Sequence, residues 1–209
     1  MKCNGMLFAA LFLGAVSIAP AGLAAQDVML GVKGGINIAD VDVEDDETFE
    51  SDTRTGLVGG LFAQFGLGDM FAIRPEGLYS QKGFSQEEEG QELTLKADYI
   101  EVPVLFAARF SQSSVRPVLF AGPVIGFEAS CKIEDATTEE SIDCEDAEVE
   151  TESTDFGATF GAGVELDAGG FVVLFDGRYT LGLSDIDAMD DSEAKNRVWS
   201  FMAGIGFQP

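Results

Sequence analysis

The chain has few basic residues and no histidine. Its 209 residues include 12 Lys and Arg against 37 Asp and Glu, which gives a formal net charge of −25. So acidic a chain is a poor candidate for binding nucleic acid, because the phosphates would repel it. It also lacks the side chain that most often acts as a general base. An enzyme is therefore the least expected class of protein, and we expect no cofactor.

Long apolar runs are missing too. Beyond residue 25 no run approaches the roughly 18 apolar residues that suggest a membrane-spanning helix. At the N-terminus, Lys2 precedes an apolar run, Met6–Ile18, and small residues follow at 22–25. That order is typical of a secretory signal. We predict that residues 1–25 are a cleaved signal peptide and that residues 26–209 form one domain.

Cysteine is scarce, with three in the chain, and Cys3 would leave with the signal. Cys131 and Cys144 remain as an even pair in an exported chain, which predicts a disulfide closing a short loop. Such a closure contributes about 3 kcal/mol in the chain-entropy model. Two free thiols are the alternative. A metal-binding pair would lack His or further Cys ligands.

Alternating apolar and polar residues are abundant, and the clearest case is Ala97–Cys131. Ile100 and Phe106 share one parity there, while Glu101 and Arg109 fall on the other. Successive side chains of a strand point to opposite faces, so this alternation predicts two strands joined by a polar turn. Ordinary strands have about 5–6 residues, whereas a tilted strand that crosses a bilayer needs about 9–11. The length of these segments favours membrane-spanning strands.

Eight such segments follow one another along the chain. They are residues 28–39, 55–67, 70–84, 97–110, 115–131, 155–167, 171–183 and 196–207. Short turns (68–69, 111–114, 168–170) alternate with long loops (40–54, 85–93, 134–154, 184–195). We predict an all-β fold, an eight-stranded antiparallel up-and-down transmembrane β-barrel with short periplasmic turns, long acidic extracellular loops and both termini in the periplasm.

The polar face of these segments carries nearly equal numbers of basic and acidic residues. A soluble barrel would turn this face outward, but in segment 55–67 it consists largely of Gly, Val and Phe. A basic residue facing lipid at mid-depth costs about 2–4 kcal/mol. The six basic residues of the polar face would together cost up to roughly 12–24 kcal/mol if they faced lipid, whereas the net stability of a folded protein is about 5–15 kcal/mol. We therefore predict a paired network filling the lumen, with a conduction path as the alternative. The predicted interior charges are Lys33, Arg74, Glu76, Lys82, Glu101, Arg109, Arg116, Glu128, Glu165, Asp176 and Arg178.

Several short sequences carry a resemblance to a known family. They are GVKGGIN (31–37), PEGLYSQKGF (75–84), DYIEVPVLF (98–106), AGPVIG (121–126), GAGVEL (161–166), GRYTLGLSDI (177–186) and NRVWSFMAGIGF (196–207). On these the chain resembles the small outer-membrane β-barrel family often called porin-family or PorT-like. The resemblance implies an eight-stranded barrel in the outer membrane and little about activity. One departure is that Gln208-Pro209 follow Phe207, where such barrels usually end on an aromatic residue.

The four predicted loops concentrate the acidity: residues 40–52, 85–92, 134–155 and 185–193 hold 28 of the 37 acidic residues. A solvated, self-repelling surface explains this composition, and a saline habitat would favour it. Asp40, Asp42 and Glu44 have the spacing of a calcium loop. Asp45, however, stands where that loop needs glycine, and Ser51 where it needs a bidentate Glu. Diffuse bridging of divalent cations to lipopolysaccharide is the preferred interpretation.

These observations favour a non-enzymatic outer-membrane barrel whose acidic loops serve interaction or envelope integrity. The expected partners are outer-membrane lipid and lipopolysaccharide, with divalent cations at the loops; no protein partner is indicated. A narrow passive pore for ions or small solutes is the alternative. It is less favoured because small barrels have filled interiors.

Overall fold

The described part of the chain is almost entirely β-strand. The computed structural model describes residues 28–43, 52–88, 91–111, 113–135, 141–144, 146, 153–184 and 194–208; at 41–43, 52, 86–88, 91–93, 135 and 194 it describes the backbone alone. The described strands are β1 (Val28–Val43), β2 (Asp52–Leu67), β3 (Phe71–Glu88), β4 (Gln91–Arg109), β5 (Val115–Asp135), β6 (Ser141–Asp143), β7 (Thr154–Asp167), β8 (Val172–Gly182) and β9 (Ala194–Phe207). Within these ranges no helix is long and apolar enough to cross a membrane.

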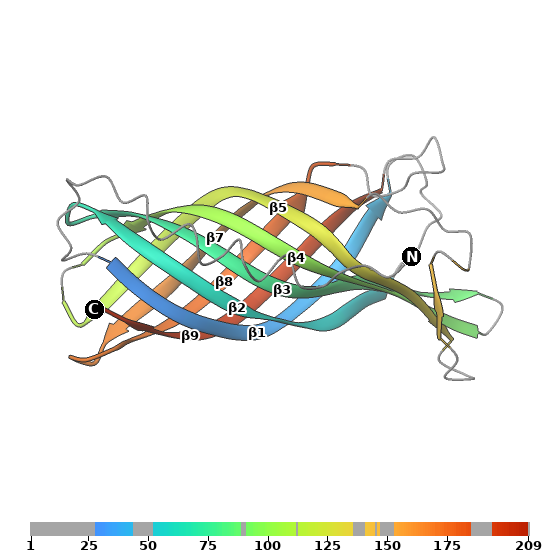
Figure 1. Cartoon of the computed structure of the whole chain (residues 1–209), viewed down its shortest axis with the longest axis horizontal. Coiled ribbons are helices and arrows are strands. Elements are labelled where there is room, and N and C mark those ends of the chain that lie inside the picture. The colour runs from blue at the N-terminus through green and yellow to red at the C-terminus, as the bar shows by residue number, and fades with distance from the viewer. Residues whose placement is uncertain are drawn as a thin grey trace, which may run out of the picture.

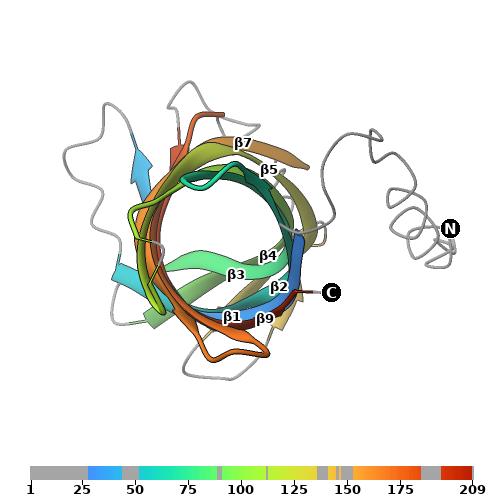
Figure 2. The ribbon, with the colours of Figure 1, turned by 90° about the vertical axis from the view of Figure 1, so that its left-hand side faces the viewer.

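Eight of these strands close into an antiparallel barrel. Each long strand pairs with its neighbours in the chain, β5 pairs with β7, and β1 pairs with β9 to complete the ring. Viewed along its axis, the ribbon forms a closed circle (Figure 2). The predicted fold class, an eight-stranded up-and-down barrel, is confirmed. Closure leaves none of the eight long strands with a free edge along the wall, because each has two partners.

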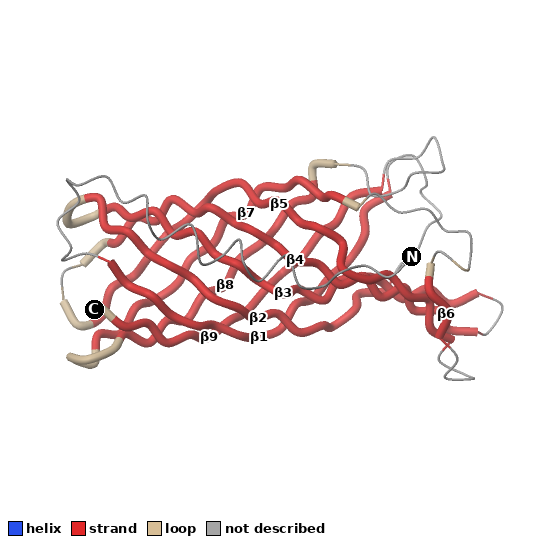
Figure 3. Tube along the Cα trace, in the orientation of Figure 1, coloured by secondary structure: helices blue, strands red, loops and turns tan. Residues whose placement is uncertain are grey.

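The two ends of the barrel differ. At one end, here called the turn end, the chain reverses at 68–70, 110–114 and 168–171, and β1 begins and β9 ends there (Figures 1 and 3). Gly68 and Gly169 have φ of 74° and 85°, which a side chain would disfavour. The other end, here called the loop end, carries β6 (Figure 3). The first turn has three residues, because Leu67 pairs with Phe71, where the sequence predicted two.

The apolar parity of the strands faces outward. On β4, Phe106 is 59% exposed, whereas Leu105 beside it is completely buried. The same alternation repeats on the other long strands, where the exposed large residues include Leu30, Val32, Leu57, Leu61, Phe71, Tyr79, Val115, Leu119, Phe156, Phe160, Phe175, Trp199 and Phe201. A water-soluble barrel would have the opposite arrangement. The predicted choice of faces is confirmed by these exposures.

The strands extend further toward the loop end than the alternation predicted. β3 continues to Glu88 and β4 starts at Gln91, so most of the predicted loop 85–93 is strand. β6 lies inside the predicted loop 134–154 and pairs with β5. Ladder hydrogen bonds hold these residues in a sheet beyond the apolar band, where alternation of hydrophobicity is no longer needed. Apolar periodicity therefore underestimated the lengths of the strands in this part of the chain.

Glycine allows the wall to close tightly at one point on β5. A Cβ added to Gly122 would overlap the carbonyl oxygen of Val104 on β4, which is backbone and cannot move aside. At Gly34 on β1, the nearest atom to an added Cβ is the carbonyl oxygen of Val58, 3.6 Å away, an ordinary contact. The two glycines therefore differ in what they tolerate, although both lie in the middle of strands.

We predict that Gly122→Ala lowers the free energy of unfolding by at least about 1–3 kcal/mol, the usual cost of overpacking. Gly34→Ala serves as the matched control and should change it by less than about 0.5 kcal/mol. Urea unfolding of the refolded protein in detergent, followed by circular dichroism, measures both. Equal stability of the two variants would contradict this account of the wall.

Candidate functional site

The interior of the barrel is filled by side chains arranged in layers. Nearest the turn end lie two buried apolar clusters. One contains Ala72, Leu105, Ala107, Val118 and Phe120, and the other Met29, Phe62, Val172 and Leu174. They come from β1–β5 and β8, because each strand turns alternate residues inward. The two clusters are together called the apolar floor.

Above the floor lies a network of six buried charges. Lys33 Nζ donates to Glu76 Oε1 at 2.5 Å and to Asp176 Oδ2 at 2.7 Å. Arg178 donates to the other oxygen of Glu76 at 2.8 Å. Arg74 pairs with Glu165 at 3.0 Å and with Asp176 at 3.2 Å. Three cations face three carboxylates, so the network is neutral when all six are ionised.

Arg74 is the most enclosed member of this network, with no exposed surface. Its Nε donates to the side-chain oxygen of Gln64 at 2.7 Å, and Gln64 in turn donates to Glu165 at 3.1 Å. The guanidinium also lies over the rings of Phe62 and Phe120, 5.9 and 5.8 Å from their centroids. These rings belong to the apolar floor, so the network rests directly on it. A buried charge this well satisfied avoids the penalty of an unpaired one.

Two uncharged layers follow toward the loop end. The first is a small apolar cluster of Val58, Leu78 and Met202, and the second is polar. In the second, the Asn37 side chain donates to Ser80 Oγ at 2.9 Å and accepts from Ser200 Oγ at 2.8 Å. These contacts join β1, β3 and β9 across the lumen. They satisfy a side chain that has no exposed surface.

A second charged cluster lies closer to the loop end. Lys82 pairs with Glu101 at 2.8 Å and with Asp155 at 3.4 Å, and its ammonium stands 4.7 Å from the ring centroid of Tyr99. Asp155 also accepts from Asn196 at 2.8 Å and from Ser184 at 2.9 Å. The cluster contains one cation and two carboxylates. Hydrogen bonds from the neutral donors supplement the single cation.

The structure brings eight of the eleven predicted charges into these two groups. The other three are placed apart. Arg109 donates to the carbonyl oxygens of Gly68 and Phe71 at the turn end, because β4 ends there. Arg116 pairs with Asp167 at the same end. Glu128 is half-buried, and its Oε2 has no hydrogen-bond partner among the described residues. For these three, parity was insufficient because it does not determine which charges a side chain meets.

The sequence analysis missed several members of the interior. Asp155 was assigned to an acidic loop and to the first position of a strand, and its inward parity was not used. Neutral partners were left out because the predicted network was defined by charged residues alone: Asn37, Gln64, Ser80, Tyr99, Asn196 and Ser200. Polar residues that interrupt an apolar face at strand spacing would have been the signal for them.

Cys131 and Cys144 form the predicted disulfide between β5 and the end of β6, with their Cα atoms 5.4 Å apart. Of the candidate calcium ligands, the backbone and side chain of Asp40 and the backbone of Asp42 are described, and Glu44 lies outside the described residues. So do residues 1–25 and most of the acidic loop residues. The described part of the chain contains no group of three or more side chains able to hold a metal ion.

Comparisons with known proteins agree with this architecture. A family model described as "Outer membrane protein beta-barrel domain" matches residues 24–188. Neisserial surface protein A (NspA) is 12% identical over 86% of this chain and 97% of its own, with a TM-score of 0.52. OprG from Pseudomonas aeruginosa is 12% identical over 87% and 96%, with a TM-score of 0.51. Ail from Yersinia pestis is 17% identical over 87% and 99%, with a TM-score of 0.47. No curated protein matches the chain in sequence.

We predict that Arg74→Met lowers the free energy of unfolding by about 3–5 kcal/mol, because it leaves a carboxylate without its share of positive charge in a closed interior. Adding Glu165→Gln to Arg74→Met should recover part of that loss, since it restores neutrality. Urea unfolding of the four variants of this double-mutant cycle gives the coupling energy.

Arg116→Met is the matched control, because its pair with Asp167 is partly exposed at the turn end. Exposed pairs contribute about 0–1 kcal/mol. If Arg74→Met lowers the free energy of unfolding by no more than Arg116→Met does, the buried network has no special role in stability.

Proposed function

The chain belongs to the outer membrane protein β-barrel domain family, and we propose that it is a non-enzymatic, non-conducting barrel that anchors an interaction surface outside the cell. Its turn end faces the periplasm and its loop end the exterior, as the usual placement of short turns and long loops in bacterial barrels suggests. The motifs around 79–83 and 99–103 favour the PorT-like branch of this family.

The closed lumen is the observation that carries the proposal. The two clusters of the apolar floor fill part of the lumen, and the neutral network of Lys33, Arg74 and Arg178 with their carboxylates packs against them. A passing ion would have to cross the floor without water and then displace ion pairs of 2.5–3.2 Å. Barrels that conduct freely have 16–18 strands and an aqueous lumen. This interior is therefore better suited to stability than to transport.

The surface at the loop end is the part available for interaction. β3, β4 and β5 have 18, 19 and 21 residues, whereas β8 has 11. Their outer portions project beyond the barrel together with β6 (Figure 1). The disulfide joins β6 to β5, and the side chains of Lys96 and Glu134 pair on the same projection. We infer that this projection and the acidic loops contact lipopolysaccharide, divalent cations or a protein partner.

Recordings in planar bilayers test the closed lumen. We predict no steady single-channel conductance from the purified protein, because the side chains that fill the lumen should block the passage of ions. A variant with residues 136–152 replaced by a short Gly-Ser linker is the control, and it should be equally silent. Reproducible conductance steps from the intact protein would contradict the proposal and favour a narrow pore. Conductance steps from the shortened variant alone would show that residues 136–152, and not the filled lumen, block the passage of ions.

Affinity capture from outer membranes tests the interaction surface. We predict that the intact protein retains a specific lipid or protein that the variant shortened at 136–152 retains at least tenfold less. A variant carrying Cys131→Ser and Cys144→Ser keeps the acidic residues but removes the link to β6. Identical captures from all three would contradict a role for this projection.

A further inference from the structure

Two arginines lie side by side where the lumen opens at the turn end. Arg109 on β4 follows Ala107 at inward parity, and Arg116 on β5 precedes Val118 at inward parity; Ala107 and Val118 belong to the apolar floor. Arg109 pairs in register with Val118, so Arg109 and Arg116 are diagonal neighbours on adjacent strands. Such neighbours lie about 7–8 Å apart, within reach of long side chains. Two like charges are therefore held close together.

Arg109 has no carboxylate partner within the described ranges. The residue is only 9% exposed, yet its Nη2 donates to main-chain oxygens alone, those of Gly68 at 3.2 Å and Phe71 at 3.5 Å. Its Nε is buried and has no hydrogen-bond partner among the described residues. A guanidinium carries five N–H donors and a full charge, and leaving them unmatched in a buried position is unfavourable. Arg109 therefore retains unused capacity to bind an anion.

Arg116 is only partly matched. Its Nη2 donates to Asp167 Oδ2 at 2.9 Å, and the two side chains are 16% and 38% exposed. Its Nε, like that of Arg109, is buried without a described partner. Glu165 lies opposite Arg116 in register, but the Glu165 carboxylate accepts from Arg74 and belongs to the neutral network. Asp167 is thus the one carboxylate that contacts Arg116 in the described part of the chain.

The inward-facing charges at the turn end leave an excess of one positive charge. Arg109 and Arg116 contribute two charges, Asp167 removes one, and the network of six buried charges is neutral. Asp69, in the first turn, is exposed, so solvent screens its charge. A cation without a matching carboxylate is unexpected in a chain with 37 acidic and 12 basic residues.

A structural role alone does not explain why position 109 carries a charge. The bonds to Gly68 and Phe71 hold the first turn against the end of β4. A neutral amide such as glutamine also has two N–H donors and could hold the turn without the cost of burying a charge. The charge itself therefore calls for an anionic partner.

We propose that Arg109 and Arg116 bind the terminal carboxylate of a peptide that enters the turn end of the barrel. A carboxylate is planar, carries one negative charge and can accept from two guanidinium groups, so it matches the excess of one. A phosphate monoester carries about −1.5 to −2 and would be repelled more strongly by Asp167. A phosphodiester carries a single charge but lies between two substituents, whereas the bore of an eight-stranded barrel admits groups only about the size of a side chain.

The short turns leave this end of the barrel accessible. The reversals at 68–70, 110–114 and 168–171 are all brief, and the long loops lie at the other end. That the peptide would come from the periplasm rests on the proposed orientation. Binding itself does not depend on the orientation, because it can be measured in detergent.

An NMR titration of the detergent-solubilised, isotope-labelled protein tests the proposal through the side-chain N–H signals of its arginines. The probes are acetyl-glycylglycine, which ends in a carboxylate, its C-terminal amide, and inorganic phosphate. We expect acetyl-glycylglycine to shift the Arg109 and Arg116 signals in a saturable manner, the amide to shift neither, and phosphate to bind more weakly. Arg109→Gln should weaken binding of the carboxylate at least about tenfold, because it removes the unmatched charge.

Arg197→Gln is the matched control. Arg197 Nη1 also donates to main-chain oxygens, those of Gly182 and Asn196, but it lies at the loop end. This variant should bind acetyl-glycylglycine as the wild type does. Circular dichroism checks folding, and if Arg109→Gln fails to fold, the partly exposed Arg116→Gln provides the same test with the same expected loss.

Absence of a saturable shift would overturn the proposal, as would wild-type affinity in a folded Arg109→Gln or Arg116→Gln variant. Equal shifts from the amide would show that the carboxylate is not recognised, and tighter binding of phosphate would show that the ligand class is wrong. None of these results bears on the conductance measurement, which tests the closed lumen separately.

Discussion

A charge in this barrel has to face its axis, and most features of the structure follow from that constraint. The outer wall meets hydrocarbon, where a lone cation costs several kcal/mol. The interior of an eight-stranded barrel is only wide enough for side chains. Charges directed inward are therefore crowded together, and crowding is favourable only if opposite charges meet. Lys33, Arg74 and Arg178 meet Glu76, Glu165 and Asp176 in this way, and all six residues are buried.

The same crowding accounts for the neutral residues around the network. A carboxylate has more lone pairs than one cation can occupy, so Gln64 bonds to Glu165, and Asn196 and Ser184 bond to Asp155. Aromatic rings complete the enclosure, since Phe62 and Phe120 lie against Arg74. The floor and the network are thus one packed unit. A barrel built like this gains stability from its interior and offers its ends and its outer wall for contact with other molecules.

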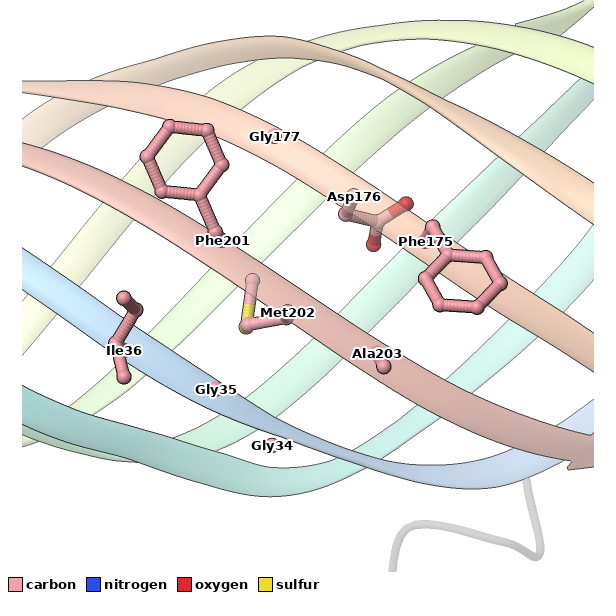
Figure 4. Close-up of a pocket in the computed structure, with 9 residues that line it drawn as sticks. All are labelled: Gly34, Gly35, Ile36, Phe175, Asp176, Gly177, Phe201, Met202 and Ala203. Atoms are coloured by element: carbon pink, nitrogen blue, oxygen red, sulfur yellow. The ribbon is translucent and has the colours of Figure 1, made fainter.

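The outer wall and the loop end are consequently where specific contacts are available. On the wall, aromatic rings of β7, β8 and β9 contact one another from Phe160 through Tyr179 and Trp199 to Phe201. Phe201 also borders a shallow groove on this wall, where Gly34, Gly177 and Ala203 of β1, β8 and β9 lie close together (Figure 4). At the loop end, β3 to β6 extend the sheet beyond the apolar band and the disulfide holds β6 against β5. Function would therefore depend on surfaces, with the lumen supplying rigidity.

The amino-acid sequence by itself determined the strand count of the barrel, its closure and the inversion of its faces. Those features depend on a local period of two residues and on the cost of placing charge in lipid, both of which can be evaluated one strand at a time. It also predicted the pairing of Cys131 with Cys144, which the structure confirms. The ends of the strands, such as the end of β3 at Glu88, were not predicted. They depend on cross-strand hydrogen bonds, which leave no apolar pattern in the sequence.

Which charges meet was decided only by the tertiary structure. Lys33 and Asp176 are 143 residues apart and share a depth only because of strand tilt and register. Arg116 and Glu128 have the same parity as the network residues, but Arg116 pairs with Asp167 although it lies opposite Glu165, and Glu128 Oε2 has no partner among the described residues. The groove of Gly34, Gly177 and Ala203 likewise exists only in three strands side by side. Parity is a property of one strand, whereas depth and adjacency are properties of the closed barrel.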